Sequence, residues 1–140
     1  MKPTAPVPDS HRDLLARPLP VVLATMGPTG FPRARPAWGE FDGSRVLVLT
    51  CRESAEARDV AARRVATVLV VDPDDTSRWI EVRGDAEVTA EGATGLADRL
   101  ARIHAANGRH GGVAVPAGSE EGPAVLRIRP TRVNLDAIHR

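Results

Sequence analysis

The strand that decides the fold is RWIEVRGDAEVT, residues 78–89. Every second residue from Ile80 to Val88 is apolar or small, and the residues between them are charged. Because successive side chains on a β-strand point to opposite faces, this alternation predicts one face on a core and the other in water. The segment therefore predicts a strand of a sheet that covers a core on one side only.

Five further segments have β-prone composition: residues 21–25, 31–41, 45–51, 65–71 and 123–134. Turn chemistry at residues 28–30 (PTG) joins the first two as a hairpin, and residues 42–43 (DG) lead into the third. Pro32 and Pro36 cannot donate hydrogen bonds to a neighbouring strand, so their segment is expected to be bulged or to face an edge or an opening.

Helical segments are inserted at three places. A capping pattern at residues 10–15, with Ser10 ahead of two leucines, predicts a short helix. Residues 53–64 and 93–106 also have helical character, and residues 107–108 (NG) are typical of a helix end. Because only one strand–helix–strand unit has a suitable length, six strands predict a small, mainly antiparallel barrel better than a parallel α/β sheet.

The length of 140 residues, with 42% hydrophobic and 26% charged residues, predicts a single domain. Residues 1–8 hold three prolines and no periodic apolar pattern, so we expect a disordered or loosely attached arm ahead of a domain at residues 9–140. Residues 109–122 are rich in glycine and are expected to form a mobile loop.

The charge balance excludes some classes of function. Lys+Arg 19 against Asp+Glu 18 leaves a net charge of +1, too even for a protein that binds along nucleic acid phosphates. No apolar stretch approaches the roughly 20 residues that span a bilayer. Cys51 is the only cysteine, and no apolar leader segment is visible, so we expect a cytoplasmic protein without disulfides and without a membrane.

Common catalytic and metal-binding signatures are missing. The chain has no nucleophile elbow, phosphate-binding lysine loop, dinucleotide fingerprint or zinc-binding helix. The acidic residues 72–75 resemble a calcium loop only superficially, because Ser77 and Arg83 stand where glycine and glutamate are required. The four histidines have no metal-ligand spacing, so no metal site is expected.

The most informative stretch is TCRES, residues 50–54, which leaves a buried strand and enters a helix. A helix N-terminus, a hydroxyl of Thr50 or Ser54 and the guanidinium of Arg52 can together hold a phosphate. Ordinary helix capping by Ser54 explains the same residues, and Cys51 fits a small buried hydrophobe. Lys2 is the only lysine, so any internal anion site must use arginines and backbone amides.

Taken in order, these features resemble the pyridoxamine 5'-phosphate oxidase-like proteins, and most closely the short deazaflavin-dependent branch. The resemblance covers residues 13 to 134 and rests on five segments: GFPRARPAW (30–38), TCRES (50–54), VDPDD (71–75), EVRG (81–84) and RIRPTRV (127–133). It implies a mainly β fold, a six-stranded antiparallel split β-barrel with short peripheral helices. It also implies a homodimer, with the flavin FMN or the deazaflavin coenzyme F420 in a groove between the subunits.

The resemblance also assigns site residues. Pro36 and Trp38 would line the ring pocket, and Thr50 and Ser54 fall on the phosphate-binding stretch. Glu56 stands where the family has a lysine, and Asp59 where it usually has asparagine. Either Arg35, Arg52 and Arg58 then take the anion in place of the lysine, or the phosphate site is lost and the fold serves another ligand. The expected cofactor-binding residues are Arg35, Pro36, Trp38, Thr50, Cys51, Arg52, Ser54, Arg58 and Trp79.

The expected function is an oxidoreductase that uses F420, or alternatively FMN, to transfer a hydride to a small organic substrate. The alternative is a non-catalytic flavin- or haem-binding protein on the same barrel, favoured by Glu56; haem would need His110 or His139 as axial ligand. Trp38 and Trp79 fit a core or dimer-interface role as well as a cofactor contact. Oxidation of pyridoxamine phosphate itself is not expected, because the chain ends soon after Val133 without the extra C-terminal strand of that enzyme.

Overall fold

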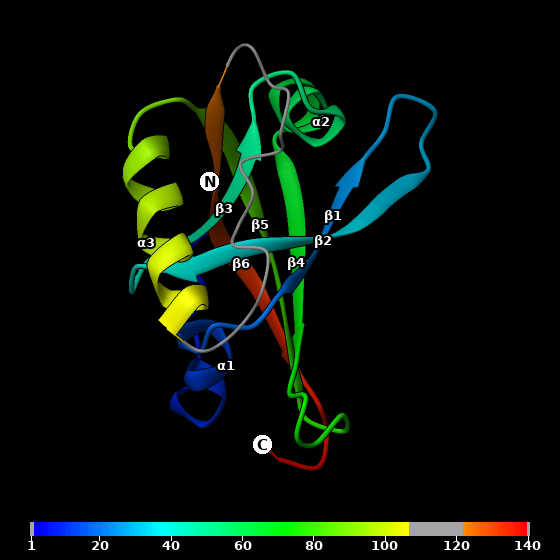
Figure 1. The fold of residues 1–140 in the computed structure, drawn as a ribbon. Coiled ribbons are helices and arrows are strands. Elements are labelled where there is room, and N and C mark those ends of the chain that lie inside the picture. Colours follow the sequence, from blue (N-terminus) through cyan, green and yellow to red (C-terminus); the bar gives the residue numbers. More distant parts are fainter. Residues whose placement is uncertain (1, 107–121, 140) are drawn as a thin grey trace.

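The computed structural model describes residues 2–106 and 122–139. Its six strands close into one barrel in the order β1-β2-β3-β6-β5-β4, and every neighbouring pair is antiparallel (Figure 1). The strands are β1 (Val21–Met26), β2 (Pro32–Phe41), β3 (Val46–Cys51), β4 (Val65–Val71), β5 (Trp79–Thr89) and β6 (Pro123–Leu135). The predicted mainly β, six-stranded antiparallel barrel is confirmed.

Four helical elements surround the barrel (Figure 1). They are the 3-10 turn η1 (Asp9–His11), α1 (Arg12–Ala16), α2 (Ala55–Arg63) and α3 (Ala93–Ala106). Leu14 and Leu15 of α1 pack at one end of the barrel interior and Val60 of α2 is also part of this core, while α3 covers β3 and β6 from outside. Each helix within residues 2–106 and 122–139 is too short or too polar to span a bilayer.

The capping prediction at the first helix is wrong in detail. The helix forms, but neither η1 nor α1 has a side-chain cap. The Ser10 hydroxyl instead lies 2.9 Å from Nδ1 of His11, a buried ring that draws the hydroxyl away from the backbone amides. The predicted end of the last helix at residues 107–108 and most of the predicted mobile loop, residues 109–121, lie outside the described residues.

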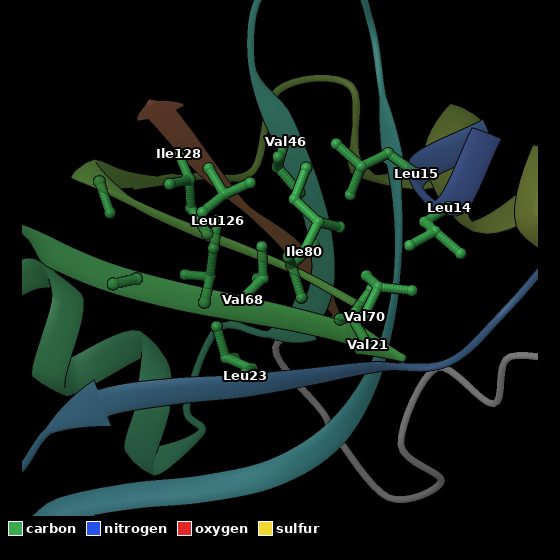
Figure 2. Packing of buried hydrophobic residues seen from close by; sticks show 14 of the residues in the cluster. Leu14, Leu15, Val21, Leu23, Val46, Val68, Val70, Ile80, Leu126 and Ile128 are labelled. Carbon is green, nitrogen blue, oxygen red and sulfur yellow. The ribbon is translucent and has the colours of Figure 1, made fainter. Parts of the chain in front are cut away.

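The interior of the barrel is apolar and follows the alternation read from the sequence. Ile80, Val82 and Ala86 of β5 are buried, whereas the charged residues between them point outward. They meet Leu126 and Ile128 of β6, both with 0% exposure, in the core drawn in Figure 2. A second apolar cluster outside the barrel joins α3 to the ends of β3 and β6; it contains Leu49, Ala93, Leu96, Ala97, Leu100 and Val125.

The long β5–β6 ladder is bent at a bulge beside Gly84. Gly84 pairs with Pro130 and Arg83 with Arg132, so Thr131 is one extra residue on β6. A Cβ atom on Gly84 would overlap the carbonyl oxygen of Arg129. The extra residue restores an inward direction for Val133, which packs against the core. Only glycine permits this close approach of the two strands.

The N-terminal residues differ from the expected loose arm. Residues 2–8 run beside β6, where the Ala5 amide donates to the Pro130 carbonyl at 2.9 Å and Nη1 of Arg129 donates to the Lys2 carbonyl at 2.8 Å. Val7 is only 5% exposed and belongs to the core. The proline-rich composition does not predict this attachment. A segment without helical or strand periodicity can still bury a single apolar side chain, as this one buries Val7.

The N-terminal turn and the C-terminal segment are joined by a buried hydrogen bond between a histidine and a carboxylate. Nε2 of His11 lies 2.7 Å from Oδ1 of Asp136, and both side chains are almost completely buried. Asp136 also accepts hydrogen bonds from the amides of Trp79 and His139. Burial alone would raise the pKa of Asp136, but the hydrogen bonds from His11, His139 and Trp79 outweigh it and hold this pKa well below its usual range.

Asp136→Asn is expected to lower the free energy of unfolding, and to do so in a pH-dependent way. Because the pKa of Asp136 is depressed in the folded state, its carboxylate stabilises the fold above the unfolded pKa of about 3.9, and this contribution is lost as pH falls through the folded pKa. Urea unfolding should show a large deficit of the variant at about pH 7 and a smaller one at about pH 3. Asp98→Asn, at an exposed position of α3, is the control. An equal deficit of Asp136→Asn at both pH values would contradict the prediction.

Gly84→Ala is expected to destabilise the protein by about 1–3 kcal/mol or more, because the added methyl group must displace the backbone of β6. Gly95→Ala is the matched control. Its Cβ would meet only a flexible guanidinium of Arg99 at 3.4 Å, so on α3 it should stabilise by about 0.5–1 kcal/mol. The denaturant midpoints of the two variants measure this difference. Equal stabilities would show that the close contact at Gly84 does not require glycine.

Candidate functional site

The candidate site lies where β3 runs into α2, beside the half of β2 that projects with β1 away from the barrel (Figure 1). Ser54 begins the helix with extended backbone, and its Oγ accepts a hydrogen bond of 3.1 Å from the amide of Ala57. The capping role of Ser54 is therefore present. The first turn of α2 also carries amides that have no partner inside the helix, which gives this end a partial positive charge.

A chain of hydroxyl groups leads from the helix cap to a buried carboxylate. Oγ1 of Thr50, at 2% exposure, donates to Oε1 of Glu56 at 2.9 Å and lies 2.8 Å from Oγ of Ser54. A carboxylate only accepts hydrogen bonds, so the Thr50 hydroxyl donates to Glu56. The Ser54 hydroxyl is then the donor to Oγ1 of Thr50. The two hydroxyl groups expected to hold a phosphate are thus both engaged with protein groups.

Glu56 and Asp59 are held by arginines of β2. Glu56 Oε2 lies 3.1 Å from Nη1 of Arg35, and Asp59 Oδ2 lies 3.1 Å from Nε of Arg33. We call these four residues the α2–β2 ion-pair cluster. Residues two apart on a strand and three apart on a helix each share a face, which is why the two pairs form side by side. The cluster compensates two nearly buried negative charges and fastens α2 to the projecting strand.

Asp59 has two further partners. Oγ1 of Thr25 donates to it at 2.9 Å, and Nη1 of Arg63 lies 3.8 Å away on the next helical turn. Thr25 and Arg33 are not among the residues that the sequence predicts for this site. The available signal was the spacing of Arg33 with Arg35 against Glu56 with Asp59, but nothing local indicates that this strand and this helix meet.

One atom of the cluster has unused hydrogen-bonding capacity. Oε2 of Glu56 is buried and, within the described residues, accepts no hydrogen bond, since the nearby Arg35 group is not oriented to donate. A buried acceptor without a donor is unfavourable. A hydroxyl group placed here would satisfy it, whereas a phosphate, which offers only more acceptor oxygens, would not.

Two arginines are exposed beside the N-terminus of α2. The Arg52 side chain is exposed, while its backbone amide donates to the Gly122 carbonyl at 3.2 Å. Arg58 is also exposed and donates from Nη1 to the Glu53 carbonyl at 2.6 Å. Both guanidinium groups retain further donors that can reach an anion beside the helix end.

The remaining predicted residues fall into different environments. Pro36 is exposed on the projecting strand, and Cys51 is buried at the end of β3 opposite Pro123. The Trp38 indole lies against the ring of His104 on α3, with centroids 3.8 Å apart, so it packs within its own chain. Trp79 begins β5 at the opposite end of the barrel, beside Asp136, and is not brought to the helix N-terminus.

Histidine and acidic side chains give no sign of a metal centre. Within residues 2–106 and 122–139, no group of three or more His, Cys, Asp or Glu side chains could hold a metal ion. His139 directs both ring nitrogens to carboxylates, at 2.9 Å from Asp136 and 3.0 Å from Asp75. His110, the other expected haem ligand, lies outside the described residues.

Comparison with known proteins gives a family and a set of similar folds. The family model described as pyridoxamine 5'-phosphate oxidase matches residues 7–135. No curated protein matches the chain in sequence. A solved F420 reductase is 26% identical, with a TM-score of 0.73 over 91% of this chain and 98% of that chain.

Two further solved structures share the fold at lower identity. Atu2129 of Agrobacterium tumefaciens, a protein of unknown function, is 17% identical with a TM-score of 0.69, over 96% of this chain and 60% of that chain. HutZ, a heme storage protein from Vibrio cholerae, is 11% identical with a TM-score of 0.65, over 94% of this chain and 95% of that chain. At such identities the likeness concerns the fold alone.

Proposed function

The chain belongs to the pyridoxamine 5'-phosphate oxidase family, and on this basis we propose that it is a flavin- or deazaflavin-dependent oxidoreductase. The proposed cofactor is F420, with FMN as the alternative, and the proposed reaction is hydride transfer to a small organic substrate. The ring of such a cofactor, when bound, carries the hydride. The observation that carries the proposal is the likeness to an F420 reductase at 26% identity over nearly the whole of both chains.

The inner part of the candidate site fits the polyol chain of such a cofactor better than its phosphate. The unsatisfied acceptor is Oε2 of Glu56, which a cofactor hydroxyl group would satisfy. A phosphate at the same place would meet a carboxylate, at a cost of about 1–4 kcal/mol at intermediate dielectric. Arg35 offsets part of this charge, but it is already shared with Glu56.

The phosphate fits the outer part of the site. Arg52 and Arg58 are exposed beside the first turn of α2, where backbone amides and the helix dipole favour an anion. Arginine forks bind phosphate oxygens through two hydrogen bonds at once. We therefore place the anion at the mouth of the site and the uncharged chain of the cofactor inside, with Thr50 and Ser54 fixing Glu56.

A second copy of the chain is part of the proposal. Residues 32–36 of β2 are exposed. Arg33 and Arg35 on one face of this half-strand pair with α2, and no described residue covers the opposite face. Phe31 at the hairpin end is 76% exposed. A homodimer would cover this surface and would put the cofactor groove at the subunit interface.

Haem binding has less support. His11 and His139 each use both ring nitrogens on neighbouring side chains, and His104 is 1% exposed against Trp38. Among the described residues, no histidine therefore presents a ring nitrogen to an iron atom. A non-catalytic flavin-binding role would use the same site without hydride transfer.

Titration of the purified protein with F420, FMN and haem, followed by absorbance and fluorescence, tests the proposed function. F420 or FMN is expected to bind with a Kd below about 1 mM, and Arg52→Gln with Arg58→Gln to weaken binding about tenfold or more. The double variant Arg102→Gln with Arg132→Gln removes the same charge at exposed sites elsewhere and should bind as the wild type does. Failure of both cofactors to bind in this range would refute the proposal, and binding without reoxidation of the reduced cofactor by any organic acceptor would refute the catalytic part.

Glu56→Gln should tighten F420 or FMN by about tenfold, because it removes a buried negative charge near the anion and releases Arg35 while keeping an acceptor for Thr50. The readout is the Kd in the same titration. Glu53→Gln, an exposed acid next to the helix start, is the matched control with a smaller expected change. If both variants bind equally, Glu56 does not act on the cofactor.

A further inference from the structure

A second charged cleft lies on the outer face of β5 and β6, and it shares no residue with the candidate site. Its volume is about 340 Å³. The outward direction follows from the strand alternation, because Ala86, Leu126 and Ile128 on the same strands point into the core. The charged residues that line the cleft are Arg45, Arg64, Asp85, Glu87, Arg127 and Arg129.

The strand register pairs the two acids with two of the arginines. Asp85 faces Arg129, with 2.5 Å between Oδ2 and Nη2, and Glu87 faces Arg127, with 3.8 Å between Oε1 and Nε. Cross-strand pairs of opposite charge of this kind are ordinary features of a sheet. These four residues together leave no net charge on the floor of the cleft.

The other two arginines supply an excess of positive charge. The guanidinium groups of Arg45 and Arg64 have no hydrogen bond or ion pair with any described residue, although both line the cleft. They come from the start of β3 and the end of α2, so they approach the floor from two sides. The cleft therefore carries two uncompensated positive charges.

Arg64 is held in an unfavourable backbone conformation. With φ of 61° it is the one non-glycine residue of the described chain with positive φ, and it ends α2 as a left-handed cap. Glycine is the usual residue at such a helix end, because it has no Cβ atom to clash. Arginine at this position places a guanidinium group at the cleft, although its backbone conformation favours glycine. Residues in such unfavourable backbone conformations are concentrated at functional sites.

Arg127 adds an unsatisfied donor. Its Nε atom is buried and has no hydrogen-bond partner among the described residues, since Glu87 is too distant to accept. Buried donors are normally paired. An oxygen acceptor from a ligand would remove this deficit.

We propose that this cleft binds a phosphate group, either as the free ion or as the monoester of a small organic molecule. A phosphomonoester carries about −1.5 to −2 charges at neutral pH, which matches the two uncompensated arginines. Guanidinium forks suit its geometry, and 340 Å³ is larger than a phosphate group needs, which leaves room for an organic part.

Calorimetric titration with inorganic phosphate and with glycerol 3-phosphate, at constant ionic strength, tests the proposal. Arg45→Gln with Arg64→Gln is expected to weaken binding about tenfold or more, because two charge-assisted contacts are lost. Arg102→Gln with Arg132→Gln carries the same charge change outside the cleft and should bind as the wild type does. Tighter binding of the ester identifies a phosphorylated molecule as the ligand, and equal binding identifies the free ion; both support the site.

Arg64→Gly separates binding from folding. It removes the strained side chain, so it should raise the thermal midpoint while it weakens phosphate binding. The proposal is overturned if the wild type shows no binding at about 10 mM phosphate, or if the Arg45 and Arg64 variants bind as tightly as the wild type. It is also overturned if only Arg52→Gln with Arg58→Gln abolishes binding, because the phosphate would then sit at α2. Neither result depends on whether F420 or FMN binds.

Discussion

The close contact between Gly84 and the backbone of Arg129 is the constraint on which the barrel depends. It allows β6 to carry one more residue than β5, so that the ladder bends while both strands keep their apolar residues inside. Before the bulge in β6, the same alternation of side chains makes Arg127 and Arg129 point outward, opposite Glu87 and Asp85 of β5. One strand register therefore places the apolar side chains of β5 and β6 in the core and their charged side chains in the outer cleft.

Ion pairs rather than hydrophobic contacts join α2 to the projecting half of β2. Glu56 is nearly buried in the first turn of α2, where Arg35 and the Thr50 hydroxyl both contact its carboxylate. The hydroxyl groups of Thr50 and Ser54 are also engaged with protein groups in this arrangement. In the proposed function, the exposed arginines at the helix start therefore receive the negative charge of the cofactor, and Glu56 accepts a hydrogen bond from one of its hydroxyl groups.

Both proposed anion sites are built from arginines, because the composition is almost free of lysine. Of the 19 basic residues, only Lys2 is not an arginine. An arginine carries five N–H donors, so Arg58 can donate to the Glu53 carbonyl and Arg127 can lie opposite the Glu87 carboxylate while other donors remain available. The difference between a structural ion pair and a binding group is therefore set by the neighbours of each side chain, not by its type.

The sequence by itself determined the strands, their inward faces and the capping of α2 by Ser54, because alternation and capping act over a few neighbouring residues. It also placed Arg35, Thr50 and Ser54 in one candidate site through a resemblance of motifs along the chain. Only the tertiary structure decided that Glu56 is neutralised by Arg35, that Asp59 joins Arg33 and Thr25, that Trp79 lies at the far end, and that Val7 is part of the core. These facts depend on which segments distant in sequence meet when the barrel closes, and no local pattern encodes that meeting.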